Sequence, residues 1–120
     1  MHNIYVLLRN FRKSKIYYMN KLELKKLKNQ IGKLLQLYRL RKGLSQLQLG
    51  NELNLSSNHV GRIERAETNP TLENIVKICN FFEIDILYLF STLNKDEITS
   101  IESEINELKE KFKNQNKRKS

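Results

Sequence analysis

Hydrophobic positions between Leu22 and Phe90 recur at spacings of three and four residues. This is the spacing of residues that share one face of an α-helix. The first helix predicted by this pattern runs from Leu22 to near Lys42 and ends at Gly43, a residue type that commonly follows the last helical turn. Its buried face is predicted to contain Leu24, Leu27, Ile31, Leu34 and Leu35.

The next stretch, residues 44–64, predicts two short helices joined by a tight turn. Ser45 and Gln48 have the spacing of a capping box, in which a hydroxyl and an amide side chain satisfy free backbone N–H groups. Asn54 tolerates the left-handed backbone of a turn, and Ser56 can cap a second helix over about residues 56–65. The residues predicted to face inward are Leu47, Leu49 and Leu53 in the first helix and Val60 and Ile63 in the second. The polar outer face of the second helix suits the major groove of DNA, where base edges offer hydrogen-bond donors and acceptors.

Two further helices complete a predicted all-α, five-helix bundle. Pro70 ends the preceding segment, Thr71 is a good N-cap, and Asp85 can cap the short helix ILYLF. The residues predicted to close the core are Leu72, Ile75, Val76, Cys79 and Phe82.

A series of short motifs occurs in order and without gaps between Ile31 and Phe90. They are GLSQ (43–46), VGRIE (60–64), NPTL (69–72) and IDILYLF (84–90). With Arg39, they resemble the helix-turn-helix domain of the lambdoid phage repressor and Cro family, also called the Xre type. The sequence departs from the family pattern at Gly50, where Ala is usual, and at Asn54 and Ala66, where Gly is usual.

The resemblance implies which side chains contact DNA. Base contacts are expected from Ser57, Asn58 and Arg62, at the start of the second short helix and one turn later. Asn can pair with adenine and Arg with guanine. The alternatives are a solvated helix start for Asn58 and an ion pair within the helix for Arg62.

Phosphate contacts are expected from Gln46, at the first position of its helix, where the helix dipole favours an anion. Arg41, Lys42 and His59 are further candidates, each with a solvated surface role as the alternative. The resemblance also implies a structural ion pair between Arg39 and Glu64, which we favour over a phosphate contact for Arg39.

The C-terminal segment, residues 92–113, predicts one more helix with a heptad-like apolar seam. Its members, spaced 3, 4, 3 and 4 apart, are Ile98, Ile101, Ile105, Leu108 and Phe112. Such a seam is typical of a parallel coiled coil. We favour a homodimer through it, because paired DNA half-sites need a two-fold protein. The alternative is that the helix folds back on its own bundle. Residues 114–120 are expected to be a disordered basic tail.

Charge is distributed unevenly along the 120 residues. The net charge is +9, and residues 1–28 alone carry eight basic and one acidic residue. Residues 29–91, the predicted DNA-binding domain, are nearly neutral. The basic N-terminal extension, residues 1–28, is expected to be partly disordered or helical, and its charge favours a polyanionic partner over a solvated basic tail. For residues 1–20 we favour a poorly ordered leader over a specific nucleic-acid contact, with Met19 as an alternative start of translation.

Other functions find little support in the sequence. One cysteine, Cys79, and two histidines, His2 and His59, give no plausible metal site, and no metal or cofactor is expected. No catalytic set is recognisable, so the protein is not expected to be an enzyme. The apolar run Ile4–Leu8 is too short for a signal peptide or a membrane span, so a cytoplasmic, nucleoid-associated protein without membrane contact is expected.

The prediction is a DNA-binding transcription regulator, a repressor that binds a palindromic operator in double-stranded DNA as a homodimer. The alternative is a regulator that binds a protein partner, such as an antitoxin, with DNA binding secondary. A non-specific nucleic-acid binder driven by the basic extension is a third possibility, and it predicts binding that depends steeply on salt and little on sequence.

Overall fold

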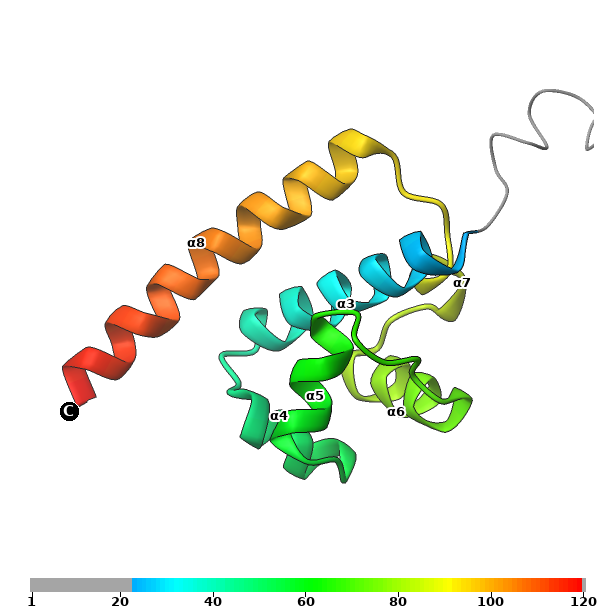
Figure 1. The fold of residues 1–120 in the computed structure, drawn as a ribbon. Helices are drawn as coiled ribbons and strands as arrows, with labels where there is room; N and C mark the ends of the chain where they lie inside the picture. The colour runs from blue at the N-terminus through cyan, green and yellow to red at the C-terminus, as the bar shows by residue number, and fades with distance from the viewer. Residues whose placement is uncertain (1–22, 120) are drawn as a thin grey trace, which may run out of the picture.

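The computed structural model describes residues 23–119, with side chains to Asn116. Within this range the chain forms helices and no strand, which confirms the all-α prediction. The helices are α3 (Leu24–Arg41), α4 (Gln46–Leu53), α5 (Ser57–Glu64), α6 (Leu72–Phe82), α7 (Ile86–Leu89) and α8 (Lys95–Lys119) (Figure 1). Residues 1–22 of the basic extension, with Met19, lie outside the described residues, and its residues 24–28 belong to α3.

Helix α3 is the centre of the fold, with α5 and α8 packed on nearly opposite faces of it (Figure 1). Gly32 and Arg39 lie on the face toward α5: a Cβ on Gly32 would stand 2.6 Å from the carbonyl oxygen of Ile63, and Arg39 reaches Glu64. Lys33 and Arg41 instead form ion pairs with α8. At 3.6 residues per turn these two sets are well over a right angle apart.

The predicted caps set the helix boundaries. The Ser45 hydroxyl accepts from the Gln48 backbone N–H while the Gln48 side chain accepts from the Ser45 N–H, so the capping box is confirmed. The Ser56 and Thr71 hydroxyls cap α5 and α6 by accepting from the backbone N–H groups of His59 and Asn74, and the Asp85 carboxylate caps α7. Asn54 has φ = 57°, the left-handed conformation expected in the turn. These short-range hydrogen bonds satisfy N–H groups that a helix start leaves free.

Helices α3 and α5 end in the same way. The residue after each helix cap, Gly43 or Ala66, has φ near +60°. In each case the N–H of this residue and the N–H of the following residue donate to carbonyls of the last helical turn, which is the pattern of a Schellman motif. Ala66 therefore performs the role of the helix-ending glycine usual in the family, despite the steric cost of a Cβ in this conformation.

One continuous core joins the six helices of the described residues. The side chains shielded almost completely are Leu34, Leu35, Leu49, Val60, Ile63, Ile78 and Leu89. Four residues predicted to be buried are instead exposed, and those predictions are wrong: Leu24, Leu47, Leu72 and Val76 are between 45% and 73% exposed. Leu24 is the first residue of α3, and the other three lie to one side of the apolar stripe of their helix, where burial depends on whether another element covers them. Cys79 is buried as predicted.

Helix α8 folds back on its own chain. Ile101 and Ile105 are buried in the core, whereas Ile98, Leu108 and Phe112 are partly covered. The fold-back arrangement is thus the one this structure shows for the seam, and dimerisation through the seam stays a prediction.

The C-terminal end of α8 differs from the predicted boundary. The helix continues to Lys119 rather than ending at Lys113 with a disordered tail. The tail sequence contains no Gly or Pro. Basic residues near a helix C-terminus also interact favourably with its dipole.

Gln30 fixes the linker between α7 and α8. Its side-chain amide donates to the backbone carbonyls of Leu89 and Ser91, and its carbonyl accepts from the Leu93 N–H at 3.3 Å. A buried amide with both ends satisfied holds the linker in one path. Gln30 therefore holds the linker that precedes α8 against α3.

Candidate nucleic-acid interface

The two sides of α5 differ sharply in burial. Val60, Ile63 and Glu64 are buried, whereas Asn58 and Arg62 are exposed and lie one helical turn apart. Asn58 and Arg62 form no side-chain hydrogen bond or ion pair with another described residue. The described part of the chain thus leaves both polar groups accessible to a ligand.

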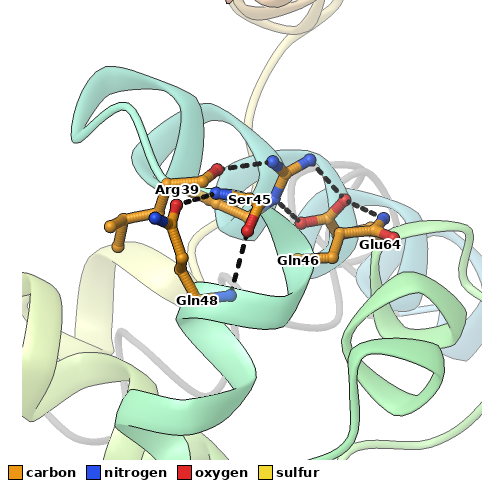
Figure 2. A network of polar contacts seen from close by, with 6 residues as sticks. Arg39, Ser45, Gln46, Gln48 and Glu64 are labelled. Atoms are coloured by element: carbon orange, nitrogen blue, oxygen red, sulfur yellow. Dashed lines mark hydrogen bonds and ion pairs between the residues drawn. The ribbon is translucent and has the colours of Figure 1, made fainter. Parts of the chain in front are cut away.

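A buried carboxylate fixes the inner side of α5 (Figure 2). Arg39 donates from Nε and Nη2 to the two Glu64 oxygens at 2.6 and 3.0 Å. Its Nη1 donates to the backbone carbonyl of Leu44 at 2.8 Å, in the turn before α4. Side-chain exposure is 7% for Arg39 and 3% for Glu64. The guanidinium therefore connects three elements, which are α3, α5 and the turn that precedes α4. Its charge is neutralised in a bidentate pair.

Gln46 joins α4 to the same carboxylate. Its Nε2 donates to Glu64 at 3.1 Å (Figure 2). The amide crosses α5 at Gly61, where an added Cβ would stand 3.3 Å from both amide heteroatoms of Gln46. Gly61 thus leaves room for this crossing, which offers a structural reason for a glycine inside a short helix. The start of α4 and the inner side of α5 are consequently held in one arrangement.

Comparisons with known proteins agree with this geometry. Residues 35–89 match the sequence profile of the helix-turn-helix family. The chain carries a Cro/C1-type helix-turn-helix domain. Over 77 residues it is 35% identical to the HTH-type transcriptional regulator SlrR of Bacillus subtilis (strain 168), an alignment that covers 62% of this chain and 51% of SlrR. The chain therefore spans about half the length of this relative.

No solved structure matches the chain. In the part of the chain that the structure describes, no helix is both long and apolar enough to cross a membrane.

Within the helix-turn-helix domain, the predicted DNA-contacting residues occupy different environments. Ser57 and His59 are partly buried beside the exposed Asn58. Gln46 is partly buried, and it has a second amide hydrogen beyond the one used by Glu64. Ser57, Asn58, Arg62 and Gln46 come from the start of α4 and the outer side of α5, the two elements that Glu64 holds together.

Arg41 and Lys42 are engaged within the chain. Arg41 donates to the two Glu104 oxygens of α8 at 2.6 and 2.8 Å, and this pairing raises the pKa of Arg41 and lowers that of Glu104. The Lys42 ammonium lies 4.7 Å from the centre of the Phe81 ring, a cation–π contact. Their phosphate contacts stay predictions, and for Arg41 the contact requires exchange of Glu104 for phosphate.

Arg65 was not predicted as a DNA contact, although it follows Arg62 by three residues on the exposed side of the domain. Its Nε and Nη2 donate to Glu67 at 2.9 and 3.2 Å. This hydrogen bonding raises the pKa of Arg65 and lowers that of Glu67. The feature of the sequence that could have indicated Arg65 as a DNA contact is its spacing of three residues after Arg62. Arg65 departs from regular helix geometry as the cap residue of α5, so the period alone does not place it.

Proposed function

We propose that the protein is a sequence-specific transcription regulator that represses by binding a palindromic operator as a homodimer. Helix α5 enters the major groove, where Asn58 and Arg62 read base edges and Ser57 lies beside them. Gln46 contacts the phosphate backbone at the start of α4, with His59 at the flank of the recognition helix. The similarity to a transcriptional regulator supports this assignment.

The contrast between the two sides of α5 carries the proposal. The inner side is fixed by the buried Arg39–Glu64 pair, so the helix is rigidly oriented before it meets a ligand. The outer side presents an amide and a guanidinium with no partner among the described residues. Each good bidentate contact from such a group discriminates between bases by about 1–3 kcal/mol. Preorganised polar groups on a helix of this size fit sequence reading better than binding to phosphates alone.

Selection from random duplexes at physiological salt tests this function. We expect the full-length protein to enrich a two-fold-symmetric site and the Asn58→Ala/Arg62→Ala variant to lose the enrichment. Equal thermal stability of the two proteins controls for unfolding. Recovery of the same unselected pool by both proteins would show that α5 does not read bases and would favour the non-specific binder.

Dimerisation is proposed through the end of α8. Ile101 and Ile105 hold α8 against α3, so Ile98, Leu108 and Phe112 are the partly exposed members of the seam, and the last two lie toward the end of the helix. Figure 1 shows the C-terminal part of α8 continuing beyond the end of α3. Sedimentation of wild type beside Leu108→Ala/Phe112→Ala should show a dimer that the variant lacks. A wild-type protein that is monomeric both free and on its operator would exclude this interface.

A protein partner is the second candidate, and the position of α8 supports it. Helix α8 lies on the side of α3 away from α5 (Figure 1), so it stays accessible when α5 holds DNA. A regulator of the antitoxin kind would use this surface. Purification of the natively expressed protein in a stable hetero-complex, which the Leu108→Ala/Phe112→Ala variant no longer forms, would favour this function over a homodimer.

A further inference from the structure

We propose that the DNA-binding surface extends beyond the helix-turn-helix to the first turns of α3. Four side chains would form a phosphate-binding row along the edge of the reading surface: Gln46, Arg65, Lys28 and Lys25. The partner is the DNA phosphodiester backbone that flanks the groove read by α5. This inference rests on the proposed DNA-binding function, and it adds Arg65, Lys28 and Lys25, which lie outside the family motifs, to the contact expected from Gln46.

The first half of the row is defined by Gly61. A Cβ on Gly61 would stand 2.8 Å from Nη1 of Arg65 and 3.3 Å from the amide atoms of Gln46. The guanidinium and the amide are therefore neighbours over the same turn of α5. Glu67 occupies Nε and Nη2 of Arg65, which leaves Nη1 as a donor beside Gln46. Glu67 is therefore a positioning residue that orients Arg65.

The second half of the row lines a hollow between α3 and the end of α5. Its volume is about 360 Å³, and Arg65 lines it together with Lys25 and Lys28. The hollow is open to solvent and bounded by positive charges from two elements. Arg65 lines this hollow and also lies near Gln46 over Gly61, so the donors form one continuous row.

The two lysines have no evident structural role. Neither Lys25 nor Lys28 forms an ion pair with another described residue. The first turn of α3 carries no acidic residue, and lysines near a helix N-terminus oppose the helix dipole. Of the carboxylates nearby in sequence or space, Glu23 pairs with Lys26, Glu64 with Arg39, and Glu67 with Arg65. The positive charge of the hollow is therefore left for an external anion. Residues 1–22, which precede it in the sequence, add five basic and no acidic residues.

Salt dependence of DNA binding tests the row directly. Each phosphate contact contributes about 0.9 to the slope of log K against log salt concentration. We expect Lys25→Gln/Lys28→Gln to lower the slope by about 1–2 and to leave the selected sequence unchanged, with Arg65→Gln lowering it by about a further 0.9. The matched control is Lys95→Gln/Lys113→Gln, which removes the same charge from exposed positions of α8.

The outcomes separate this inference from the proposed function. A Lys25→Gln/Lys28→Gln slope no different from that of the control overturns the row, even if the protein still selects an operator. A wild-type protein that selects no sequence overturns the proposed base reading. In that case the row is tested by the same slopes on an arbitrary duplex. Thermal unfolding of each variant shows whether a lost contact reflects a loss of fold.

Discussion

Two ion pairs on α3 have nearly the same geometry and very different surroundings. Arg39 holds Glu64 with hydrogen bonds of 2.6 and 3.0 Å, and Arg41, two residues later, holds Glu104 with 2.6 and 2.8 Å. The side chains of the first pair are 7% and 3% exposed, whereas those of the second are 45% and 38% exposed. The first fixes α5, and the second attaches α8.

We infer that burial, rather than hydrogen-bond length, decides how much each pair contributes to stability. In a buried pair, removing one partner leaves an uncompensated charge away from water. An exposed pair is weakened by solvent and salt, and such pairs contribute between 0 and about 1 kcal/mol. The α5 side of α3 is therefore expected to be rigid, and the α8 side to depend on its apolar contacts.

Substitution of the buried carboxylate should have the largest effect. Glu64→Gln places an amide N–H among the donors of Arg39 and Gln46 and removes the charge that neutralises the guanidinium. We expect a loss of about 3–5 kcal/mol in the free energy of unfolding, measured by urea denaturation. A loss below about 1 kcal/mol would mean that the two ion pairs are energetically alike and that the comparison is wrong.

Truncation of the α8 seam should come next. Ile105 is 4% exposed, and Ile105→Ala removes buried methyl groups at a cost of about 2–5 kcal/mol where the site cannot collapse. We expect the loss to fall mainly on α8, measured as faster amide hydrogen exchange in α8 than in α5. Equal acceleration in both helices would show that α8 and the bundle unfold as one unit.

The exposed pair should give the smallest effect. Glu104→Gln is expected to cost less than about 1 kcal/mol at neutral pH, and less at high salt. Because the hydrogen bond from Arg41 lowers the folded pKa of Glu104, its contribution is present above the ordinary glutamate pKa. The contribution is lost as the pH falls through the folded value. The stability difference between wild type and Glu104→Gln should therefore shrink on acidification, and a difference that grows would contradict this.

The sequence predicted the features that short-range chemistry determines. Ser45 and Gln48, Ser56, Thr71 and Asp85 cap their helices as expected, because a cap and its N–H partner are two or three residues apart. Family resemblance supplied the helix-turn-helix domain, which the profile match confirms.

Features set by distant neighbours were not predictable in the same way. Leu47 and Leu72 have helical spacing but face solvent, because no other element of residues 23–119 covers their edge of the stripe. Gln30 is buried, and its polar side chain gave no indication of burial in the sequence. The apolar seam of α8 predicts contact with another apolar surface, but it does not predict whether that surface belongs to α3 or to a second chain. Arg65, Lys25 and Lys28 come together only when the end of α5 meets the start of α3.

The most direct test of the account is the affinity of Arg62→Ala for the selected operator and for a scrambled duplex of equal length. If α5 reads bases through its outer side, the variant should lose about 5- to 150-fold on the operator, equivalent to about 1–3 kcal/mol. It should lose much less on the scrambled duplex, with unfolding unchanged. Equal weakening on both duplexes would mean that Arg62 contacts phosphate and that α5 does not carry the sequence preference.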